Sequence, residues 1–541
     1  MKKTCVSLLA LFVASHTAMA AEQHQIWGEK NAFVPNPHPI STGLSPQNYQ
    51  LKPISSTSNQ QHARYQLTFK GIPVWGHQLI FHNNPGKKSL ITGTSVTGIE
   101  ADINNTEGKL SAEAVEKKIL ANTKDAIKYK VIKKVIYIDN QQQAHLAYHL
   151  SFYTNDSKLK PSAPNYIIDA NDGEVLKQWN NVHQLNVGQG LGGNAFNLPY
   201  RLGGFQYGNA LPGLLSLGKF DVKVSKGYCF VQNNNVKVIN LENMELNEEA
   251  FPIGAQDEIR YKLDAFSYPC SPQSAYINYA DGMTGPVHYS FSPVNDTMYF
   301  AQATLKMYSE FYGIQQPLGN DLPLRAFTHI GELDNAFAIP SIYDGEHLLA
   351  HQQIIIGNGS EYLTAPSQSV IGHELSHNFT ELNSGLIYDK QSGGINESFS
   401  DMAAIALQDY LRKSYPWYWD GKDWSIGREA GMHAEPLRYM DNPTQDGASI
   451  DNAQNYTDEL DVHFTSGVFN KAFYLLSSQP GWSVRKAFQV MVDANQHYWQ
   501  PESTYELAAC GVLQATKDRG WDKAAVIQAF KGVGVTCPNE I

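Results

Sequence analysis

Apolar and polar residues alternate in several stretches of the first 180 positions. Residues 63–82 read ARYQLTFKGIPVWGHQLIFH, and their period of two on either side of Gly71-Ile72-Pro73 predicts two strands joined by a turn. Residues 111–122 (SAEAVEKKILAN) predict instead a helix that Ser111 caps. Further strand-like runs are VIKKVIYID, HLAYHLSFYT and NYIIDANDGEVLKQW, the last with a turn at Asn171-Asp172-Gly173. This first region is therefore expected to mix strands with helix.

The pattern changes after residue 180. Residues 181–194 (NVHQLNVGQGLGGN) are rich in glycine and indicate a linker or processing site. From about 195 to 360 the chain reads as strands with long loops, and from about 367 onward as mostly helical. Ser367 or Ser369 can cap a helix that runs to about Leu382 and closes at Asn383-Ser384-Gly385. The next helix is expected to start after Gly393-Gly394, and later ones at about 463–477, 482–497, 503–518 and 522–532.

The first 20 residues have the order of a secretory signal peptide. Lys2 and Lys3 precede a short apolar stretch, and Ala18-Met19-Ala20 offers the small residues that a signal peptidase reads. A buried N-terminal helix is the alternative, and it does not explain this order. Cleavage before Ala21 is expected. No later stretch reaches 18 apolar residues, so we expect no membrane anchor.

Composition excludes several classes of protein. The chain has 541 residues, of which 42% are hydrophobic and 17% charged, as in globular proteins rather than disordered or fibrous ones. At roughly 150 residues per domain this length suggests about three or four domains. The formal net charge is -11, which makes the phosphate backbone of a nucleic acid an unfavourable partner.

Four cysteines remain once Cys5 leaves with the signal peptide: Cys229, Cys270, Cys510 and Cys537. An exported protein meets an oxidising environment, so two disulfides are expected. The cysteines form two close couples in the sequence, which favours pairing Cys229 with Cys270 and Cys510 with Cys537. A zinc site made of all four is the alternative, but C-x-x-C spacing is absent.

The predicted helix near residue 370 contains the sequence HELSH. His373 and His377 are four residues apart, so their imidazoles lie on one helical face and can bind one metal ion. Glu374 is placed to reach a water on that metal. Zinc fits best, since two histidines and one carboxylate leave a fourth position open for water.

A third ligand is found further along the chain, in GGINESFSD. Glu397 lies 20 residues after His377 (397 − 377 = 20), a spacing that lets a second helix fold back beside the first. Asp401 follows one turn later and can accept the outer N–H of a zinc-bound histidine. The competing motif with a third histidine fails, because Thr380 and Asn383 occupy its glycine and histidine positions.

Residues 373–404 (HELSHNFTELNSGLIYDKQSGGINESFSDMAA) resemble the thermolysin family of secreted zinc endopeptidases, most closely its pseudolysin and vibriolysin-like branch. The similarity covers nearly the whole chain. It implies an α+β fold with a thermolysin-like two-lobed catalytic domain, preceded by an α+β propeptide of two modules. The implied parts are a signal peptide (1–20), an FTP-like module (21–100), a PepSY-like module (101–185), a β-rich N-terminal lobe (186–366) and a mainly helical C-terminal lobe (367–541).

The resemblance also implies roles for particular residues. The zinc ligands correspond to His373, His377 and Glu397, and the general base to Glu374. The remaining implied residues are the oxyanion donors Tyr388 and His463, the acid Asp458 that orients His463, the substrate-binding Arg438, Asn335 and Ala336, and Val370 and Leu437 in an apolar wall that favours a bulky apolar residue after the cut.

Two stretches depart from the family pattern. Ala338 stands at the position of a usual tryptophan, and extra residues follow it along the strand that lines the cleft. Ser369, Ile405 and Gln408 occupy positions where the family has calcium-binding acids, while Asp423 corresponds to a retained one. Because calcium prefers several carboxylates, we expect its site to be largely lost.

The resemblance implies a zinc-dependent endopeptidase, made as a proprotein and secreted through the periplasm as a monomer. Its propeptide is expected to serve as intramolecular chaperone and inhibitor, and to be removed by the enzyme itself between Val182 and Val187. Leu185 and Val187 fit an apolar pocket there. The alternative is a zinc-binding but inactive relative that works as a binding protein. Protein and peptide substrates are the expected partners in the first case.

Overall fold

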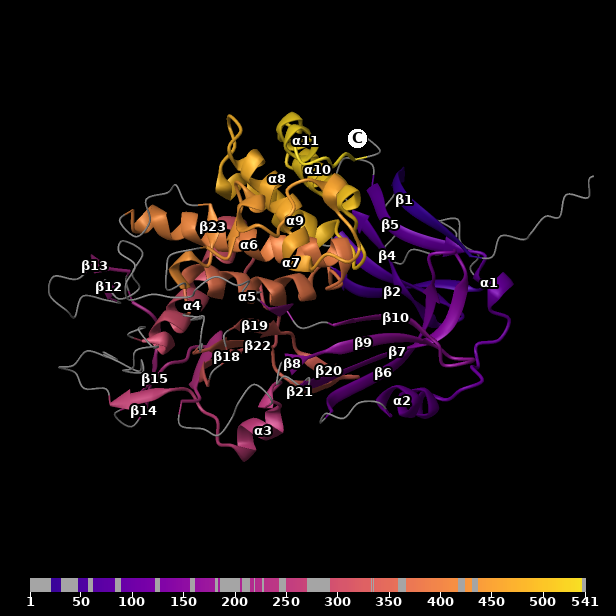
Figure 1. Ribbon diagram of the computed structural model, residues 1–541, viewed down its shortest axis with the longest axis horizontal. Helices are drawn as coiled ribbons and strands as arrows, with labels where there is room; N and C mark the ends of the chain where they lie inside the picture. The colour runs from indigo at the N-terminus through magenta and orange to yellow at the C-terminus, as the bar shows by residue number, and fades with distance from the viewer. Residues whose placement is uncertain are drawn as a thin grey trace, which may run out of the picture. The chain divides into compact units, whose positions relative to one another are not determined.

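The computed structural model of the chain divides into two compact units, and each is described by itself (Figure 1). The first unit comprises residues 1–115, 134–148 and 168–176, and the second comprises 116–133, 149–167 and 177–541. The residues that the structure describes are 21–30, 47–56, 62–82, 89–121, 127–155, 161–180, 183–184, 205–206, 215–217, 219–225, 228–242, 250–269, 292–331, 333, 335–358, 366–416, 424–430 and 436–537. The predicted signal peptide lies outside them.

The first unit is built on antiparallel strands. Its strands are β1 (Glu22–Lys30), β2 (Tyr49–Ser56), β3 (His62–Phe69), β4 (Ile72–His82) and β5 (Ser89–Thr97), with the neighbours β1-β5-β4-β3-β2. The predicted turn joins β3 to β4, and Gly71 adopts a φ of 84° there, which a glycine reaches without strain. Tyr65, Leu79, Phe81 and Ile91 pack together on one face. The predicted strand pair is therefore confirmed.

The other predicted elements of this region are also present. Ser111 caps α2 (Ala112–Leu120), since its Oγ accepts a hydrogen bond from the backbone N–H of Ala114 at 3.2 Å. The turn at Asn171-Asp172-Gly173 has Gly173 at a φ of 73°. The short helix α1 (Ile99–Asp102) precedes α2, and the strands that follow are β6 (Lys128–Ile138), β7 (Ala144–Asn155), β8 (Pro161–Ser162), β9 (Pro164–Asp169) and β10 (Val175–Asn180).

The second unit contains a five-stranded sheet in the order β11-β19-β22-β18-β16. The strands are β11 (His183–Gln184), β16 (Val236–Asn240), β18 (Leu324–Ile330), β19 (Ala336–Ile339) and β22 (Gln353–Gly357). The strands β16, β18 and β22 are parallel, whereas β19 is antiparallel to β22 and β11 is antiparallel to β19. The short strand β11 therefore forms one edge of this sheet.

A hairpin is inserted between β19 and β22, where the sequence has its extra residues. It consists of β20 (Ile342–Asp344) and β21 (His347–Ala350), with Gly345 at a φ of 61° in the turn. The remaining short elements before it are β12 (Phe205–Gln206), β13 (Leu215–Ser216), β14 (Lys223–Ser225), β15 (Tyr228–Phe230), α3 (Ala255–Arg260) and β17 (Ser267–Pro269).

One long helix was not expected from the sequence pattern. Helix α4 (Pro293–Tyr312) lies in the stretch assigned to strands and loops, and nearly all of its residues are buried. It packs against β16, β18 and α5 (Gln368–Leu382), so apolar residues surround it and produce no single amphipathic stripe. Its end signals were nevertheless present: the Ser292 side chain caps it, Pro293 is its first residue, and Gly313 ends it at a φ of 74°.

The C-terminal part is helical, as predicted. Ser367 caps α5 through a hydrogen bond from the backbone N–H of Val370 at 3.3 Å. The later elements are α6 (Lys390–Ser414), β23 (Ser425–Ile426), η4 (Arg428–Ala430), β24 (Arg438–Tyr439), η5 (Pro443–Asp446), η6 (Ala453–Asn455), α7 (Val462–Thr465), α8 (Gly467–Ser477), α9 (Val484–His497), α10 (Tyr505–Asp518) and α11 (Ala524–Lys531).

The predicted start of α6 is wrong. The helix begins at Lys390, so Gly393 and Gly394 lie inside it rather than before it. Close packing explains both glycines: a Cβ on Gly393 would lie 2.4 Å from Cγ1 of Val462, and a Cβ on Gly394 would lie 2.4 Å from Oγ1 of Thr465. They allow α7 to approach α6 and do not break the helix.

One predicted disulfide is present. Cys510 and Cys537 are bonded, with their Cα atoms 5.0 Å apart, and tie α10 to the chain end. Cys229 is buried and disulfide-bonded, whereas its predicted partner Cys270 lies outside the described residues. Among the described residues, no helix has both the length and the apolar character needed to cross a membrane.

Candidate metal centre and active site

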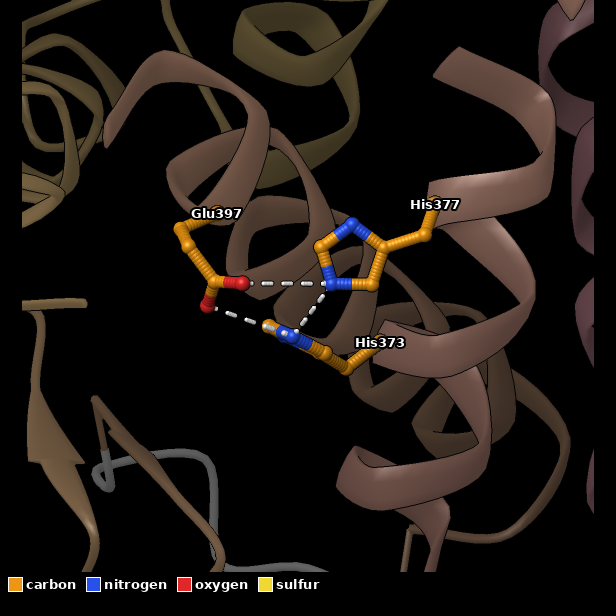
Figure 2. A group of neighbouring side chains, drawn as sticks. All are labelled: His373, His377 and Glu397. Carbon is orange, nitrogen blue, oxygen red and sulfur yellow. Dashed lines mark hydrogen bonds and ion pairs between the residues drawn. The ribbon is translucent and has the colours of Figure 1, made fainter. Parts of the chain in front are cut away.

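The side chains of His373, His377 and Glu397 converge between α5 and α6 (Figure 2). The two histidines project from neighbouring turns of α5, and Glu397 reaches them from α6. All three side chains are buried, and one ligand atom from each lies within 4.8 Å of the others. The helices bring together the three residues that the sequence singled out.

The hydrogen bonds of the two rings fix where their protons lie. The Nδ1 of His373 is 2.8 Å from Oδ1 of Asp401, and the Nδ1 of His377 is 2.9 Å from Oδ1 of Asn396. The amide nitrogen of Asn396 donates to the carbonyl oxygen of Leu386 at 3.0 Å, so its oxygen faces the ring. Both Nδ1 atoms therefore donate, which leaves both Nε2 atoms with a lone pair.

These two lone pairs lie close together. The Nε2 atoms of His373 and His377 are 2.9 Å apart, and the carboxylate of Glu397 lies 3.4–3.5 Å from them. Since neither Nε2 carries a proton, no hydrogen bond relieves this approach. A cation that accepts both lone pairs and the carboxylate does relieve it, and two imidazole nitrogens with one carboxylate are a ligand set of catalytic zinc. The residues present therefore fit zinc.

Charged and polar neighbours fix the position of Asp401, which in turn orients His373. Asp401 accepts two hydrogen bonds from Arg438, at 2.7 and 2.8 Å, and a third from Asn470 at 2.8 Å. Burial opposes ionisation of Asp401, but Arg438 and His373 outweigh it and lower its pKa to about 2. Burial lowers the pKa of His373 to about 4, despite the carboxylates nearby. The ring is therefore neutral, as a metal ligand must be.

Glu374 lies directly beside this centre on α5. Its side chain is buried, and neither carboxylate oxygen has a hydrogen-bond partner among the described residues. Burial, and then the charge of Glu397, raise its pKa well above the ordinary value. A buried carboxylate without partners is costly to the fold, which is typical of a group retained for chemistry.

Tyr388 and His463 also approach this centre. The Tyr388 hydroxyl donates to Oε1 of Glu397 and lies 3.1 Å from Nε2 of His463. Although burial favours the neutral ring, Glu397 and Asp461 raise the pKa of His463. Both groups present a donor toward the space beside the ligands.

The structure corrects the acid that contacts His463. Asp461, not the predicted Asp458, lies 2.5 Å from its Nδ1 and also accepts the backbone N–H of His463 at 2.9 Å. Asp458 is half exposed and pairs instead with Lys390 and Tyr456. Asp461 is the N-cap of α7, and this position two residues before the histidine directs its carboxylate back to the ring. An N-cap signal could have identified it from the sequence.

The predicted substrate-binding residues lie on several elements. Arg438 is buried on β24, where Asp401 holds its guanidinium. Asn335 precedes strand β19, which begins with Ala336 and contacts α5. Val370 is buried in the first turn of α5, and Leu437 packs over Gly427. Asn396 and Asn470, which contact the metal centre or Asp401, were not predicted.

In the region of the predicted calcium site, Ser369 makes hydrogen bonds to Gly427 and Glu429. The hydroxyl of Ser369 accepts the backbone N–H of Gly427 at 3.0 Å, and its backbone N–H donates to Glu429 at 2.7 Å. Ile405 and Gln408 are buried on α6. Asp423 lies outside the described residues.

Four family models match the chain in succession. They are the fungalysin/thermolysin propeptide motif at residues 51–95, the peptidase propeptide and YPEB domain at 109–179, the thermolysin metallopeptidase catalytic domain at 213–381 and the thermolysin metallopeptidase alpha-helical domain at 384–535. The boundary between the last two models falls inside the metal centre. His373 and His377 lie in the catalytic-domain match, and Glu397 lies in the alpha-helical-domain match.

Similar proteins extend over most of the chain. The hemagglutinin/proteinase of Vibrio cholerae is 32% identical and covers 96% of this chain and 80% of its own length. The neutral protease of Vibrio proteolyticus is 31% identical over 92% of this chain and 74% of its own length. The zinc metalloproteinase MspA of Legionella longbeachae is 35% identical over 88% of this chain and 86% of its own length. The chain thus belongs to the thermolysin family of metallopeptidases, zinc enzymes that hydrolyse peptide bonds, and carries that family's propeptide ahead of its catalytic domain.

Proposed function

We propose that this chain is a self-processing, secreted endopeptidase whose zinc is held by His373, His377 and Glu397. The single observation that carries the proposal is the approach of two unprotonated Nε2 atoms to 2.9 Å beside a carboxylate. When bound there, zinc polarises the scissile carbonyl and lowers the pKa of a water molecule. The remaining chemistry falls to residues of the chain.

Glu374 acts as the general base in this proposal. Its carboxylate has no other hydrogen-bond partner among the described residues, so it is available to a water beside the metal centre. Its raised pKa favours the protonated form after it has taken the proton of the attacking water. It then passes that proton to the leaving amine. A raised pKa makes a carboxyl group a better carrier of a proton between two reaction partners.

Tyr388 and His463 stabilise the oxyanion. The tyrosine hydroxyl and the Nε2 of His463 lie 3.1 Å apart and can both turn toward one developing negative charge. Asp461 supports this role because it holds the opposite nitrogen of His463 and raises its pKa. With the carboxylate of Asp461 at Nδ1, the ring keeps that proton and is favoured to carry a second one on Nε2 for donation.

The substrate extends along strand β19 in this proposal, at the position where β11 pairs with it. Asn335 and Ala336 bind its backbone near the cut, and Arg438 binds a carbonyl oxygen on the far side. Val370 and Leu437 form an apolar wall, which favours a bulky apolar residue after the cut. Ala338, which replaces the usual tryptophan, leaves a smaller side chain at this edge.

Strand β11 supports self-processing. It pairs with β19 in the antiparallel direction, with His183 opposite Ala338 and Gln184 opposite Phe337, and it also contacts the zinc-binding helix α5. The chain thus occupies the edge proposed for substrate. Leu185 and Val187 are the next apolar residues after Gln184, and the proposed apolar wall favours a cut directly before one of them. Both bonds fall inside the predicted interval, and residues 185–190 lie outside the described residues.

The inactive, metal-binding alternative rests only on the altered edge at Ala338. Against it stands the full set of ligands, base and donors, together with relatives named as proteases. Secretion of a monomer follows from the signal-peptide pattern and the resemblance. We also propose that the calcium site is largely lost, since Ser369 and Gln408 offer only neutral groups.

Replacing Glu374 by glutamine tests the base. The Glu374→Gln variant should retain one zinc per chain but lose peptidase activity by at least about a hundredfold, because the proton acceptor is gone while the ligands remain. The variant should also remain at its full size, uncut near Leu185. Zinc content, peptide hydrolysis and mass spectrometry measure these outcomes. Glu310→Gln, an exposed carboxylate on α4, is the control. Near-normal hydrolysis by Glu374→Gln would remove the assignment.

A pair of aspartate variants tests the orientation of His463. Asp461→Asn should lower kcat by about tenfold or more, since the imidazole loses the carboxylate that keeps it charged and oriented. Asp458→Asn should change kcat less than twofold, because Asp458 contacts Lys390 and Tyr456 instead. Steady-state kinetics on one peptide compares them. The reverse order of effects would restore the acid expected from the family pattern.

Loss of either imidazole partner should weaken metal binding. Asp401→Ala and Asn396→Ala should each lower zinc affinity by about 10–100-fold, because a freed ring can turn away from the ligand position. Competition with a zinc-binding dye gives the affinity. Ser398→Ala is the matched control on α6, since its hydroxyl donates to Asn470 and not to a histidine ring. Unchanged affinity in both alanine variants would contradict this role.

Calcium should barely affect thermal stability. Calcium binds six to eight oxygens with several carboxylates among them, and Ser369 already accepts the backbone N–H of Gly427. The thermal midpoint of zinc-loaded Glu374→Gln protein should therefore move by less than about 2 °C between millimolar calcium and a calcium-selective chelator. A rise of many degrees at micromolar calcium would show that the site is intact.

A further inference from the structure

An apolar face of the peptidase sheet is covered by residues of the propeptide. Ala163 is buried in the same cluster as Phe251, Phe337 and Ile342, and Tyr129 and Tyr153 pack against that cluster. Ala163, Tyr129 and Tyr153 lie in the segment that matches the propeptide domain model, residues 109–179. All of these residues belong to the second compact unit. The second propeptide module therefore completes a core of the peptidase.

Tyr129 enters a socket that only glycine leaves open. Its hydroxyl donates to Oδ2 of Asp257 at 2.9 Å, and the same oxygen accepts the backbone N–H of Gly254 at 3.1 Å. A Cβ on Gly254 would lie 2.1 Å from the Tyr129 hydroxyl and 3.1 Å from the carbonyl oxygen of Leu349. The φ of Gly254 is -83°, so its backbone does not require glycine. The space that Tyr129 occupies does require it.

The backbone of Tyr129 is itself strained in this position. Its φ is 49°, in the left-handed region that a bulky residue rarely adopts. Burial, and then Asp257, raise the pKa of its hydroxyl, which therefore remains a donor near neutral pH. A strained backbone is kept only where surrounding contacts favour it, and here those contacts come from the peptidase.

The inserted hairpin forms one wall of the socket. Leu349 lies on β21, and Asp321 anchors the base of this hairpin by accepting the hydroxyl of Ser341 at 2.5 Å and the backbone N–H of Gln352 at 3.0 Å. The wall is thus fixed to the peptidase rather than to the propeptide. A second contact, between Lys177 and Glu502 at 2.8 Å, is partly exposed and contributes little by comparison.

We propose that Tyr129 and its socket, formed by Gly254, Asp257 and Leu349, are a latch that retains the cleaved propeptide and delays the onset of peptidase activity. The partner is the second propeptide module of the same chain. The proposal rests on the self-cleavage proposed above. Cleavage removes the covalent link, and within the part of the chain that the structure describes, two residues of β11 pair with β19. The buried contacts around Tyr129 then set how long the two parts remain together.

The full-length chain tests the latch through four variants. After self-cleavage, the propeptide that co-elutes with the peptidase is followed over time, together with hydrolysis of a short peptide. Gly254→Ala should be cut at the wild-type rate yet release its propeptide about tenfold faster or more, because the added methyl overlaps the Tyr129 hydroxyl. Tyr129→Phe should accelerate release a few-fold. Lys177→Ala should change it less than twofold.

The double variant supplies the decisive comparison. Tyr129→Phe in the Gly254→Ala background should slow release relative to Gly254→Ala alone, since removal of the hydroxyl eliminates the 2.1 Å contact and leaves the milder one of 2.9 Å with the ring carbon Cζ. Wild-type release by Gly254→Ala, or additive acceleration in the double variant, would overturn the latch. If neither the wild-type chain nor any variant cuts itself, the proposal of self-cleavage is contradicted and the latch must be tested separately. The same co-elution is then measured on Glu374→Gln chains cut at the junction by an added protease, with the same expected and contradicting results.

Discussion

Two imidazole rings held with their Nε2 atoms 2.9 Å apart determine the rest of the peptidase centre. Their Nδ1 protons are committed to Asp401 and Asn396, so neither ring can direct a proton toward the other. Both rings are also buried. A divalent cation would accept both lone pairs and so remove the repulsion between them. The folded chain therefore needs the metal for its own electrostatic balance as well as for chemistry.

Close packing of helices produces that approach. A Cβ on Gly372 of α5 would lie 3.2 Å from a methyl group of Leu407, and Gly393 and Gly394 admit α7 against α6 in the same way. The narrow space gathers several charges, of which Asp401 is matched by the two hydrogen bonds of Arg438. Buried charges of this kind are tolerated only when each is paired, and the metal supplies the remaining positive charge.

Sequence patterns predicted what depends on spacing along one helix. The i, i+4 histidines of residues 373–377 and the distance to Glu397 are local features, and the structure brings these residues together as expected. The role of Asn396 appears only when α6 folds back against His377, so no local pattern predicts it. Family spacing predicts Asp458 as the acid, whereas the capping geometry of α7 places Asp461 there. Gly393 has the pattern of a helix breaker because its neighbour Val462 is 69 residues away in sequence (462 − 393 = 69), and no local pattern reveals that contact.

We infer that the two Nε2 lone pairs and Glu397 form one cation site. Anomalous diffraction from crystals of the purified Glu374→Gln protein, recorded on both sides of the zinc absorption edge, shows whether zinc occupies it. We expect one strong peak within about 2.0–2.2 Å of Nε2 of His373, Nε2 of His377 and a carboxylate oxygen of Glu397. A zinc peak bound elsewhere, with the two rings rotated apart and hydrogen-bonded through Nε2, would contradict it.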